Sequence, residues 1–311
     1  LVSSNGQVVA DASGQVIHGQ TDCVLQFTPT DNGIYLATLT VTDMDGGNGL
    51  AQAFVTVNNV SPQNVDFVAP QAVDEGTLVF LQAAFADPGQ ADTHSYSWRV
   101  TCTNGQVVVQ GASPAFSFAP DDNGFYTVTL TVTDKDGGAG TATTTIHVDN
   151  VTPSVSLGQN LTRNEGDLIT VAGSFSDPGT ADSHTFLWHV VSSNGQVISD
   201  ATTSDLSFTP LDDGSYLVTF KATDDDQEVG IGQISVTVNN VAPQNVRVVG
   251  PGTADEGTVL SLQAAFTEPG QADTHTWSWQ VTSTNGQLVQ PGAGSAFTFT
   301  PDDNGTYTVT L

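Results

Sequence analysis

Positive charge is nearly absent from this sequence. Its 311 residues contain 5 Lys and Arg against 33 Asp and Glu, which gives a formal net charge of −28 at pH 7. Because almost no cations are available to meet phosphates, we expect no nucleic-acid partner. The same shortage means that most carboxylates cannot be neutralised by salt bridges. They are therefore expected either to face water or to bind metal ions.

Long apolar runs and helical periodicity are also absent. No stretch approaches the length that spans a bilayer, so no membrane insertion is expected within this segment. No signal peptide is visible and the chain begins at Leu1, inside a repeated pattern, so we interpret it as a piece of a longer protein. The lack of helical periodicity indicates an all-β fold.

Cysteine is rare as well. Cys23 and Cys102 are the two cysteines, and they stand at different positions of the repeated pattern. No disulfide framework is therefore predicted. Buried or free thiols are the expected state, and a bridge between chains is the alternative.

What the sequence does contain is a repeat of about 90 residues. Gly33, Gly124, Gly214 and Gly305 are spaced by 91, 90 and 91 residues. Equivalent tryptophans and glutamates follow the same period, namely Trp98, Trp188, Trp279, Glu75, Glu165 and Glu256. A period of this length is the size of one small sandwich domain. The predicted domains are a partial repeat 1 (1–60) without its front strands, complete repeats 2 (61–151) and 3 (152–241), and a partial repeat 4 (242–311) without its last strand.

The most regular stretch of the repeat is a strand between two acidic turns. In residues 126–132, apolar side chains alternate with threonine, which is the pattern of a half-buried strand. Residues 121–124 before it and 134–138 after it are rich in Asp and Gly, which favour turns. The acidic groups therefore lie at opposite ends of one strand.

Each complete repeat predicts about seven antiparallel strands in two packed sheets, so the chain is expected to be a series of immunoglobulin-like sandwiches strung end to end. Trp98 lies on the third long strand and Tyr126 begins the sixth, which fits the buried tryptophan and the tyrosine corner of such sandwiches. We expect this tryptophan and its counterparts to be buried. Asn104 and Gly105 predict a tight turn of the hairpin type.

The residues around this strand also carry a resemblance. The sequence Tyr-Thr-Val-Thr-Leu-Thr-Val-Thr-Asp-Lys-Asp-Gly-Gly at 126–138, preceded by Asp-Asn-Gly, resembles the polycystic kidney disease (PKD) domain. Tandem copies that end in Val-Asn-Asn-Val-Ala-Pro, as at 238–243, resemble the arrays of large bacterial surface and secreted proteins. The likeness extends over nearly all of the chain.

This resemblance implies a protein that is not an enzyme. We expect an extracellular or cell-surface array that serves as a stalk, adhesin or filament. Its expected partners are neighbouring repeats of the same long chain, with like chains in a fibre or surface glycans as further candidates. The alternative is an accessory region of a secreted hydrolase, acting as a spacer or as a carbohydrate-binding module.

The acidic turns predict calcium between repeats. Near Thr152, one pole of repeat 2, the linker and one pole of repeat 3 would supply Glu75, Asp121, Asp122, Asp149, Asn150, Asp177, Asp182, Asp224 and Asp226. The other pole of repeat 2 carries Asp87, Asp92, Asp134 and Asp136. Carboxylate and amide oxygens are the ligands that Ca²⁺ prefers, and the layout resembles cadherin arrays, where acidic loops and an Asn-rich linker share calcium ions. The alternative is that these Asp residues are ordinary turn formers.

Histidine recurs in the loop after the second strand of each repeat, as His94, His184 and His275. A zinc site or a general base beside the neighbouring Asp is conceivable, but a hydrogen bond that braces the loop is the expected role. No Ser-His-Asp order and no Gly-x-Ser-x-Gly elbow stands out. The recurring Trp and Phe are expected in the cores and not as platforms for sugars.

Overall fold

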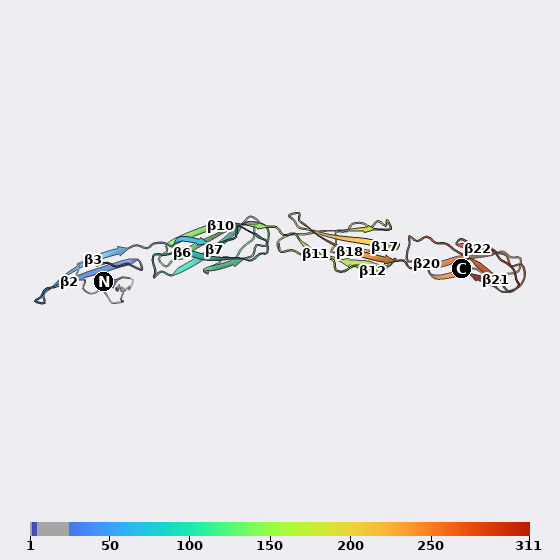
Figure 1. Ribbon diagram of the computed structural model, residues 1–311, viewed down its shortest axis with the longest axis horizontal. Helices are drawn as coiled ribbons and strands as arrows, with labels where there is room; N and C mark the ends of the chain where they lie inside the picture. Colours follow the sequence, from blue (N-terminus) through green and yellow to red (C-terminus); the bar gives the residue numbers. More distant parts are fainter. Residues whose placement is uncertain (1, 5–24) are drawn as a thin grey trace. The chain divides into compact units, whose positions relative to one another are not determined.

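The computed structural model describes residues 2–4 and 25–311, so the prediction for Cys23 lies outside the described residues. Every regular element of the described part is a β-strand (Figure 1). In this part, no helix is available that could cross a membrane. The chain divides into two compact units. The first comprises Leu1–Val151 with Pro178–Asp182, and the second comprises Thr152–Asp177 with Ser183–Leu311.

Repeat 2, in the first unit, is a sandwich of two sheets. One sheet has the strand order β4-β6-β8 and the other has the order β5-β10-β9-β7. The strands are β4 (Gln63–Phe67), β5 (Ala72–Asp74), β6 (Val79–Ala86), β7 (His94–Cys102), β8 (Ala115–Phe118), β9 (Gly124–Asp134) and β10 (Ala139–Asp149). The predicted number of about seven strands and the two packed sheets are confirmed.

The alternation of the central strand is preserved in space. Tyr126, Val128, Leu130 and Val132 of β9 are fully buried, while the intervening threonines are partly exposed. Two of these threonines, Thr127 and Thr129, face threonines of β10 across the ladder, with hydroxyl oxygens 3.3 and 3.2 Å apart. One face of β9 therefore packs in the core and the other carries a row of cross-strand polar contacts.

One strand pair departs from the predicted antiparallel arrangement. The short strand β5 pairs with β10 in parallel, with Ala72 opposite His147, because the chain crosses from the sheet of β4 to the other sheet before β6 begins. In repeat 3, β12 (Leu161–Asn164) pairs in parallel with β18 (Val229–Asn239) in the same way. The other ladders are antiparallel.

The turn at Asn104 and Gly105 exists, and Gly105 has a φ of +90°. No regular hairpin follows it: β7 pairs with β9, and the returning segment makes only an isolated bridge between Gly111 and Trp98. The side chain of Asn104 is used elsewhere, because its amide donates to the hydroxyl of Tyr126 at 2.6 Å.

The first unit also contains the described part of repeat 1. Its three strands, β1 (Val2–Ser3), β2 (Gly33–Thr42) and β3 (Asn48–Val57), form one antiparallel sheet in that order. Tyr35 on β2 is fully buried, as its counterpart Tyr126 is on β9.

The second unit contains repeats 3 and 4. Repeat 3 consists of β11 (Ser154–Ser156), β12, β13 (Ile169–Ala172), β14 (Ser174–Ser176), β15 (Thr185–Ser192), β16 (Asp205–Phe208), β17 (Gly214–Thr223) and β18. Its largest sheet has the order β12-β18-β17-β15. Repeat 4 consists of β19 (Gln244–Val249), β20 (Leu260–Thr267), β21 (Gln280–Ser283), β22 (Ala296–Phe299) and β23 (Tyr307–Thr310).

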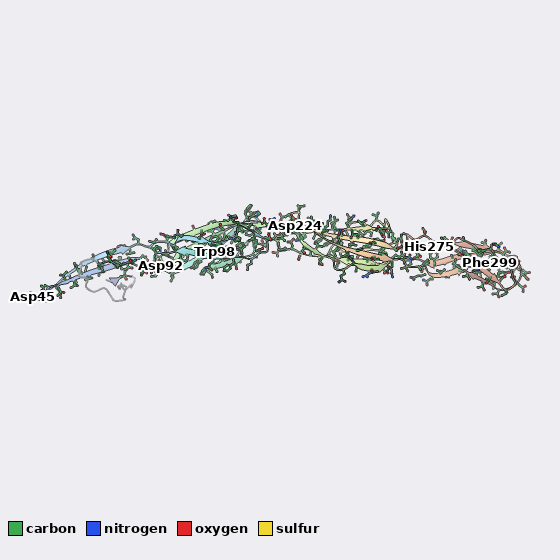
Figure 2. The ribbon with its side chains drawn as sticks, viewed as in Figure 1. Asp45, Asp92, Trp98, Asp224, His275 and Phe299 are labelled. Atoms are coloured by element: carbon green, nitrogen blue, oxygen red, sulfur yellow. The ribbon has the colours of Figure 1, made fainter. Side chains whose placement is uncertain are left out.

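A tryptophan lies at the centre of each of three separate core clusters. Trp98, Trp188 and Trp279 are all fully buried, which confirms the prediction. Each indole N–H donates to a backbone carbonyl at 2.9 Å, so burial leaves no polar group unsatisfied on the ring. Figure 2 shows Trp98 among the strands of its sandwich, whereas Asp92 lies near the end of the same sandwich.

Candidate functional site

The loop after the second strand is braced by a histidine. His94 Nε2 lies 2.8 Å from Asp87 Oδ2, and His184 Nε2 lies 2.9 Å from Asp177 Oδ2. In repeat 4 a glutamate replaces this aspartate, and His275 Nε2 lies 3.0 Å from Glu268 Oε2. The predicted bracing hydrogen bond is therefore confirmed, and it explains why position 268 keeps a carboxylate.

The same loop docks on the turn of the preceding repeat. The backbone N–H of Ala272 donates to the carbonyl of Leu211 at 2.9 Å in the second unit. Within the first unit, Ala91 donates to Thr30 at 3.1 Å and Ala181 donates to Asp121 at 2.9 Å. Loops of similar sequence thus make the same main-chain hydrogen bond in three repeats.

A glycine makes room for this docking. Gly166 has a φ of +78°, and a Cβ atom at this position would lie 2.9 Å from Pro269 Cβ. Gly76 and Pro178 repeat the arrangement in the first unit, with a φ of +71° and a distance of 2.8 Å. Both the backbone conformation and the close contact therefore require glycine.

The tyrosine corner fixes the acidic turn on which the loop docks. The hydroxyl of Tyr216 donates to the carbonyl of Asp212 at 3.1 Å, and the amide of Asn194 donates to that hydroxyl at 2.7 Å. The equivalent pair in repeat 2 is Tyr126 and Asp122, at 3.0 Å. The turn is thus held from inside the core through a backbone carbonyl and not through a carboxylate.

A buried glutamate completes the arrangement. Glu75 and Glu165 are only 2% and 1% exposed. Glu75 Oε1 accepts the N–H of Val151 at 2.8 Å, and Glu165 Oε1 accepts the N–H of Val241. In each case one carboxylate oxygen binds the linker that leads to the next repeat. Oε2 of Glu165 is buried and accepts no hydrogen bond.

These elements bring carboxylates from neighbouring repeats together. In the first unit, Glu75, Asp122 and Asp182 place one oxygen each within 4.8 Å of one another. In the second unit, Glu165 forms two such groups, one with Asp212 and Asp213 and one with Glu268 and Asp273. We call the second set the Glu165 cluster: Glu165, Asp212, Asp213, Glu268 and Asp273. At the other pole of repeat 2, Asp92 belongs to two more groups. One group includes Asp31 and Asp136, and the other includes Asp87 and Asp134.

Two residues predicted as ligands, Asp134 and Asp224, accept hydrogen bonds from within the protein. Asp134 Oδ1 accepts the N–H groups of Asp136 and Gly138 at 2.9 and 2.8 Å, and its Oδ2 accepts the amide of Asn59 at 2.9 Å. Asp224 Oδ1 accepts the N–H of Glu228 at 2.8 Å. Both carboxylates accept backbone N–H groups of their own turns, which is the role of an ordinary turn-forming aspartate.

The remaining predicted ligands lie in different surroundings. Asp149 is half-exposed and pairs with His147 Nδ1 at 2.9 Å. Asp226 is exposed, and Asn150 is partly buried in the linker. Oδ1 of Asp121 is buried and accepts no hydrogen bond. Of the residues predicted for the junction near Thr152, the structure thus groups Glu75, Asp122 and Asp182.

The electrostatics of the clusters reflect their burial. Burial raises the pKa of Glu165, and the neighbouring carboxylates of Asp273, Asp213 and Glu268 add to the effect, while the hydrogen bond from Val241 opposes it. Burial also raises the pKa of Asp273, with Asp212 and Glu268 contributing. For Asp134, burial favours a raised pKa, but the hydrogen bonds from Asn59 and from backbone N–H groups outweigh it and lower the pKa. Asp134 is thus stabilised as a carboxylate, whereas in the Glu165 cluster burial and neighbouring carboxylates outweigh the hydrogen bond from Val241 and the effect of His275.

One cluster holds a cation of the protein itself. Lys135 Nζ lies 2.7 Å from Asp31 Oδ1, 2.5 Å from Asp92 Oδ1 and 2.5 Å from Asp136 Oδ2. Hydrogen bonds to Asp136, Asp31 and Asp92 raise the pKa of Lys135, so it stays protonated. The sequence pattern predicted no role for Lys135 or Asp31. It also did not predict Glu165, Asp212 or Asp273 as calcium ligands. The 90-residue period was the available signal for the last three, because they are the counterparts of Glu75, Asp122 and Asp182.

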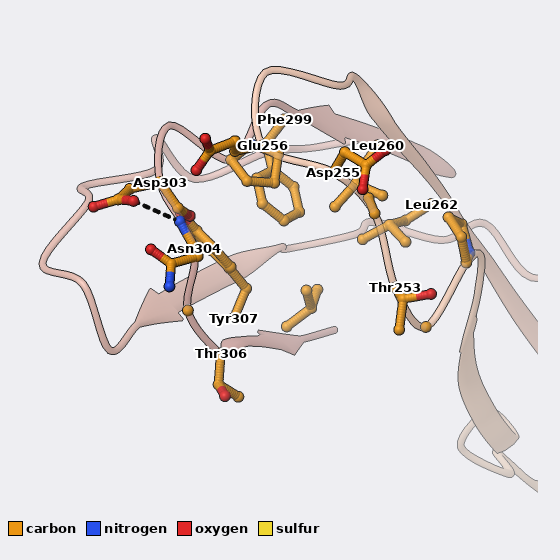
Figure 3. A pocket seen from close by; sticks show the side chains of 16 residues that line it. Thr253, Asp255, Glu256, Leu260, Leu262, Phe299, Asp303, Asn304, Thr306 and Tyr307 are labelled. Atoms are coloured by element: carbon orange, nitrogen blue, oxygen red, sulfur yellow. Dashed lines mark hydrogen bonds between the residues drawn. The ribbon is translucent and has the colours of Figure 1, made fainter.

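A groove of about 940 Å³ lies in repeat 4. Leu262, Phe299 and Tyr307 line it together with Glu256 and Asp303 (Figure 3). In repeat 2 the strands equivalent to two walls of this groove are β5 and β9, and both pair with β10. The groove therefore lies at the position that β10 occupies in repeat 2, and it does not indicate a small-molecule site.

The fold and these junctions define a class: tandem immunoglobulin-like β-sandwiches connected through acidic loops. More specifically, the chain carries tandem PKD-like repeats. Residues 59–148 match the PKD domain family, and residues 158–238 match the family described as K319L-like, PKD domain.

The relatives are large mammalian proteins. Human dyslexia-associated protein KIAA0319 is 28% identical over 278 residues, covering 82% of this chain and 24% of the relative. Mouse dyslexia-associated protein KIAA0319-like protein is 30% identical over 221 residues, covering 65% and 20%. The chain thus spans a quarter or less of the curated relatives it matches. These relatives give no support to a bacterial origin.

Among solved structures, the tetra-tandem repeat in the extending region of a large adhesion protein is similar to this chain. It has a TM-score of 0.33 and 15% identity, and the match covers 88% of this chain and 74% of that one.

Proposed function

We propose that this chain is part of an extracellular structural array, a stalk or adhesin in which PKD-like sandwiches hold a binding or signalling region away from a surface. The observation that carries the proposal is the repeated docking of one loop on the preceding repeat. Its hydrogen bonds measure 3.1, 2.9 and 2.9 Å. A connection that recurs in this way favours a defined angle between repeats over a freely jointed chain.

Calcium ions at the junctions are the second part of the proposal. Each cluster combines the turn of one repeat with the loop of the next, as in Glu75, Asp122 and Asp182. An ion bound to oxygens from both sides would offset the repulsion among carboxylates and restrict bending. With 5 Lys and Arg in 311 residues, the chain itself supplies few alternatives.

The proposed array acts through binding and not through catalysis. Its partners are neighbouring repeats of the same chain, with like chains or surface glycans as candidates for adhesion. Asp87 and Asp177, two acids that lie beside a histidine, are engaged in bracing their loops.

Two measurements test this function. Antibody against the repeats should label intact, unpermeabilised cells that express the full-length protein, and labelling only after permeabilisation would exclude the array from the cell exterior. Small-angle scattering of the 311-residue chain should show a larger spread of conformations after chelation of Ca²⁺. An identical profile with and without chelator would remove calcium stiffening from the proposal.

A further inference from the structure

We call Lys135 with Asp31, Asp92 and Asp136 the Lys135 cluster. The Glu165 cluster and the Lys135 cluster place equivalent carboxylates at equivalent positions. Asp212 of the first corresponds to Asp31 of the second, because each is the acid whose carbonyl accepts the tyrosine-corner hydroxyl, from Tyr216 and Tyr35 respectively. Asp273 corresponds to Asp92, because each lies one residue after the alanine that makes the docking hydrogen bond. The two sites therefore differ in what stands between equivalent carboxylates.

In the first unit that place is taken by an ammonium group. Lys135 Nζ contacts three carboxylates at 2.5 to 2.7 Å, while its own side chain stays one-third exposed. Among residues 25–311, no Lys or Arg forms an ion pair with the Glu165 cluster.

The Glu165 cluster shows a second, independent sign that it takes a ligand. Glu165 is 99% buried, since its exposure is 1%, and its Oε1 is fixed by the linker N–H of Val241. Its Oε2 is buried without a hydrogen-bond partner and faces the docked loop, where it would be 2.6 Å from a Cβ atom placed on Gly270. A buried carboxylate oxygen without a donor is costly, and a cation is the group that would satisfy it.

We propose that Glu165, Asp212 and Asp273 bind a divalent cation, and that the Lys135 ammonium takes the place of that ion between Asp31 and Asp92. The oxygen-only donor set selects a hard cation such as Ca²⁺ or Mg²⁺ and not a soft metal. Ca²⁺ accepts six to eight oxygens in flexible geometry, so Asp213, Glu268 and water complete its shell. The two clusters then respond differently to removal of metal ions.

This inference rests on the proposed calcium-stiffened junctions, but its test counts ions and does not depend on stiffness. The 311-residue chain is freed of metal with a chelator and then titrated with Ca²⁺ by calorimetry and equilibrium dialysis. Glu165→Gln and Asp273→Asn should each reduce the number of bound ions by one, with affinities in the range of roughly 10⁻⁴ to 10⁻³ M that is typical of extracellular modules.

Asp92→Asn is the matched control, because Asp92 is the counterpart of Asp273 in the cluster that Lys135 fills. It should leave the number of bound ions unchanged. Lys135→Met, which introduces the residue found at the equivalent position of repeat 1, should add one ion. Circular dichroism checks that each variant is folded.

Three results would overturn the inference: an unchanged ion count in Glu165→Gln and Asp273→Asn, an equal loss in Asp92→Asn, or no binding in the millimolar range. Binding with the expected counts but an unchanged scattering profile would support the site and refute the stiffening function, so the two failures are distinguishable.

Discussion

Trp188 is the residue on which repeat 3 depends most. It is fully buried, lies 4.4 Å from the ring centroid of Phe220, and donates its indole N–H to Thr203. Trp188→Ala removes both the ring contacts and the hydrogen bond, so we expect a loss of roughly 3–5 kcal/mol in the unfolding free energy of its own repeat. Domain-resolved chemical denaturation measures this loss.

Trp188→Phe is the control, because it keeps an aromatic ring and removes the indole donor. It should cost less than the alanine variant. Since the core clusters are separate, repeat 2 should keep its transition midpoint in both variants. Equal destabilisation of repeats 2 and 3 would contradict independent cores.

Glu165 makes the folding stability depend on pH, and burial of its carboxylate determines the sign of this dependence. Its pKa is raised above the ordinary value of 4.5, first by burial and then by neighbouring carboxylates. A raised pKa means that the folded state binds the proton more tightly than the unfolded chain. This contribution to stability is complete below the unfolded pKa and is lost as pH rises through the folded pKa. Asp273, whose pKa is raised from 3.8, acts in the same direction.

Without divalent cations, the melting temperature of wild type relative to Glu165→Gln should therefore fall as the pH rises above the ordinary glutamate pKa of 4.5. The charged and titratable side chains that face Glu165 and Asp273 are those of Asp212, Asp213, Glu268 and His275. Added Ca²⁺ should remove most of the difference at neutral pH. A constant difference in melting temperature between the two proteins as the pH rises would show that burial of Glu165 does not oppose its ionisation.

At the residue scale the sequence predicted much of the core and part of the site. Alternation and the 90-residue period identified the buried Trp and Tyr residues. They did not identify Lys135, because a lysine among turn acids has the same sequence pattern whether it faces water or three carboxylates. Nor could they separate Asp134, which binds its own turn, from Asp122, which faces the next repeat. That difference depends on side-chain direction, which the spacing does not encode.

Among the elements, the loop after the second strand carries the junction, and Gly166 is the residue that permits its docking. Gly166→Ala would strain a φ of +78° and place Cβ 2.9 Å from Pro269 Cβ. The left-handed conformation alone costs about 1–2 kcal/mol for an L residue. The clash adds to this, so we expect faster amide exchange at Ala272 and a lower melting temperature.

Gly257→Ala separates the two contributions. Gly257 has nearly the same φ, +76°, and a Cβ atom there would meet nothing within 4 Å. This variant should show the cost of strain without faster exchange at Ala272. If both variants change the exchange at Ala272 equally, the contact with Pro269 does not matter for docking.

The element that sequence could not predict is the parallel pair at the edge of each large sheet. β5 has three residues and β12 has four, which is too short for periodicity to reveal a direction. Their pairing follows from the crossing of the chain between sheets, a tertiary feature. This pairing matters for the site, because β5 leads directly into Glu75, whose N–H donates to Asp149 at the end of β10.

In the molecule as a whole, each sandwich of repeats 2 to 4 has its own core, and the proposed source of positive charge differs between the junctions. The cores do not include the acidic clusters, so removal of Ca²⁺ should leave the sandwiches folded. Far-ultraviolet circular dichroism should therefore be unchanged by chelator. A loss of β structure on chelation would mean that metal binding and folding are coupled, contrary to this description.

The backbone N–H groups of the docked loops allow each junction to be measured separately. The N–H of Ala272 bonds to Leu211 beside the Glu165 cluster, and the N–H of Ala91 bonds to Thr30 beside Lys135. Chelation should speed hydrogen exchange at Ala272, because the carboxylates then repel one another, and should leave Ala91 unchanged, because Lys135 remains in place. In Lys135→Met the exchange at Ala91 should become sensitive to chelator as well. Exchange measured by mass spectrometry on peptides that cover the two loops decides the matter: equal sensitivity of both loops in the wild type would mean that Lys135 does not substitute for a metal ion.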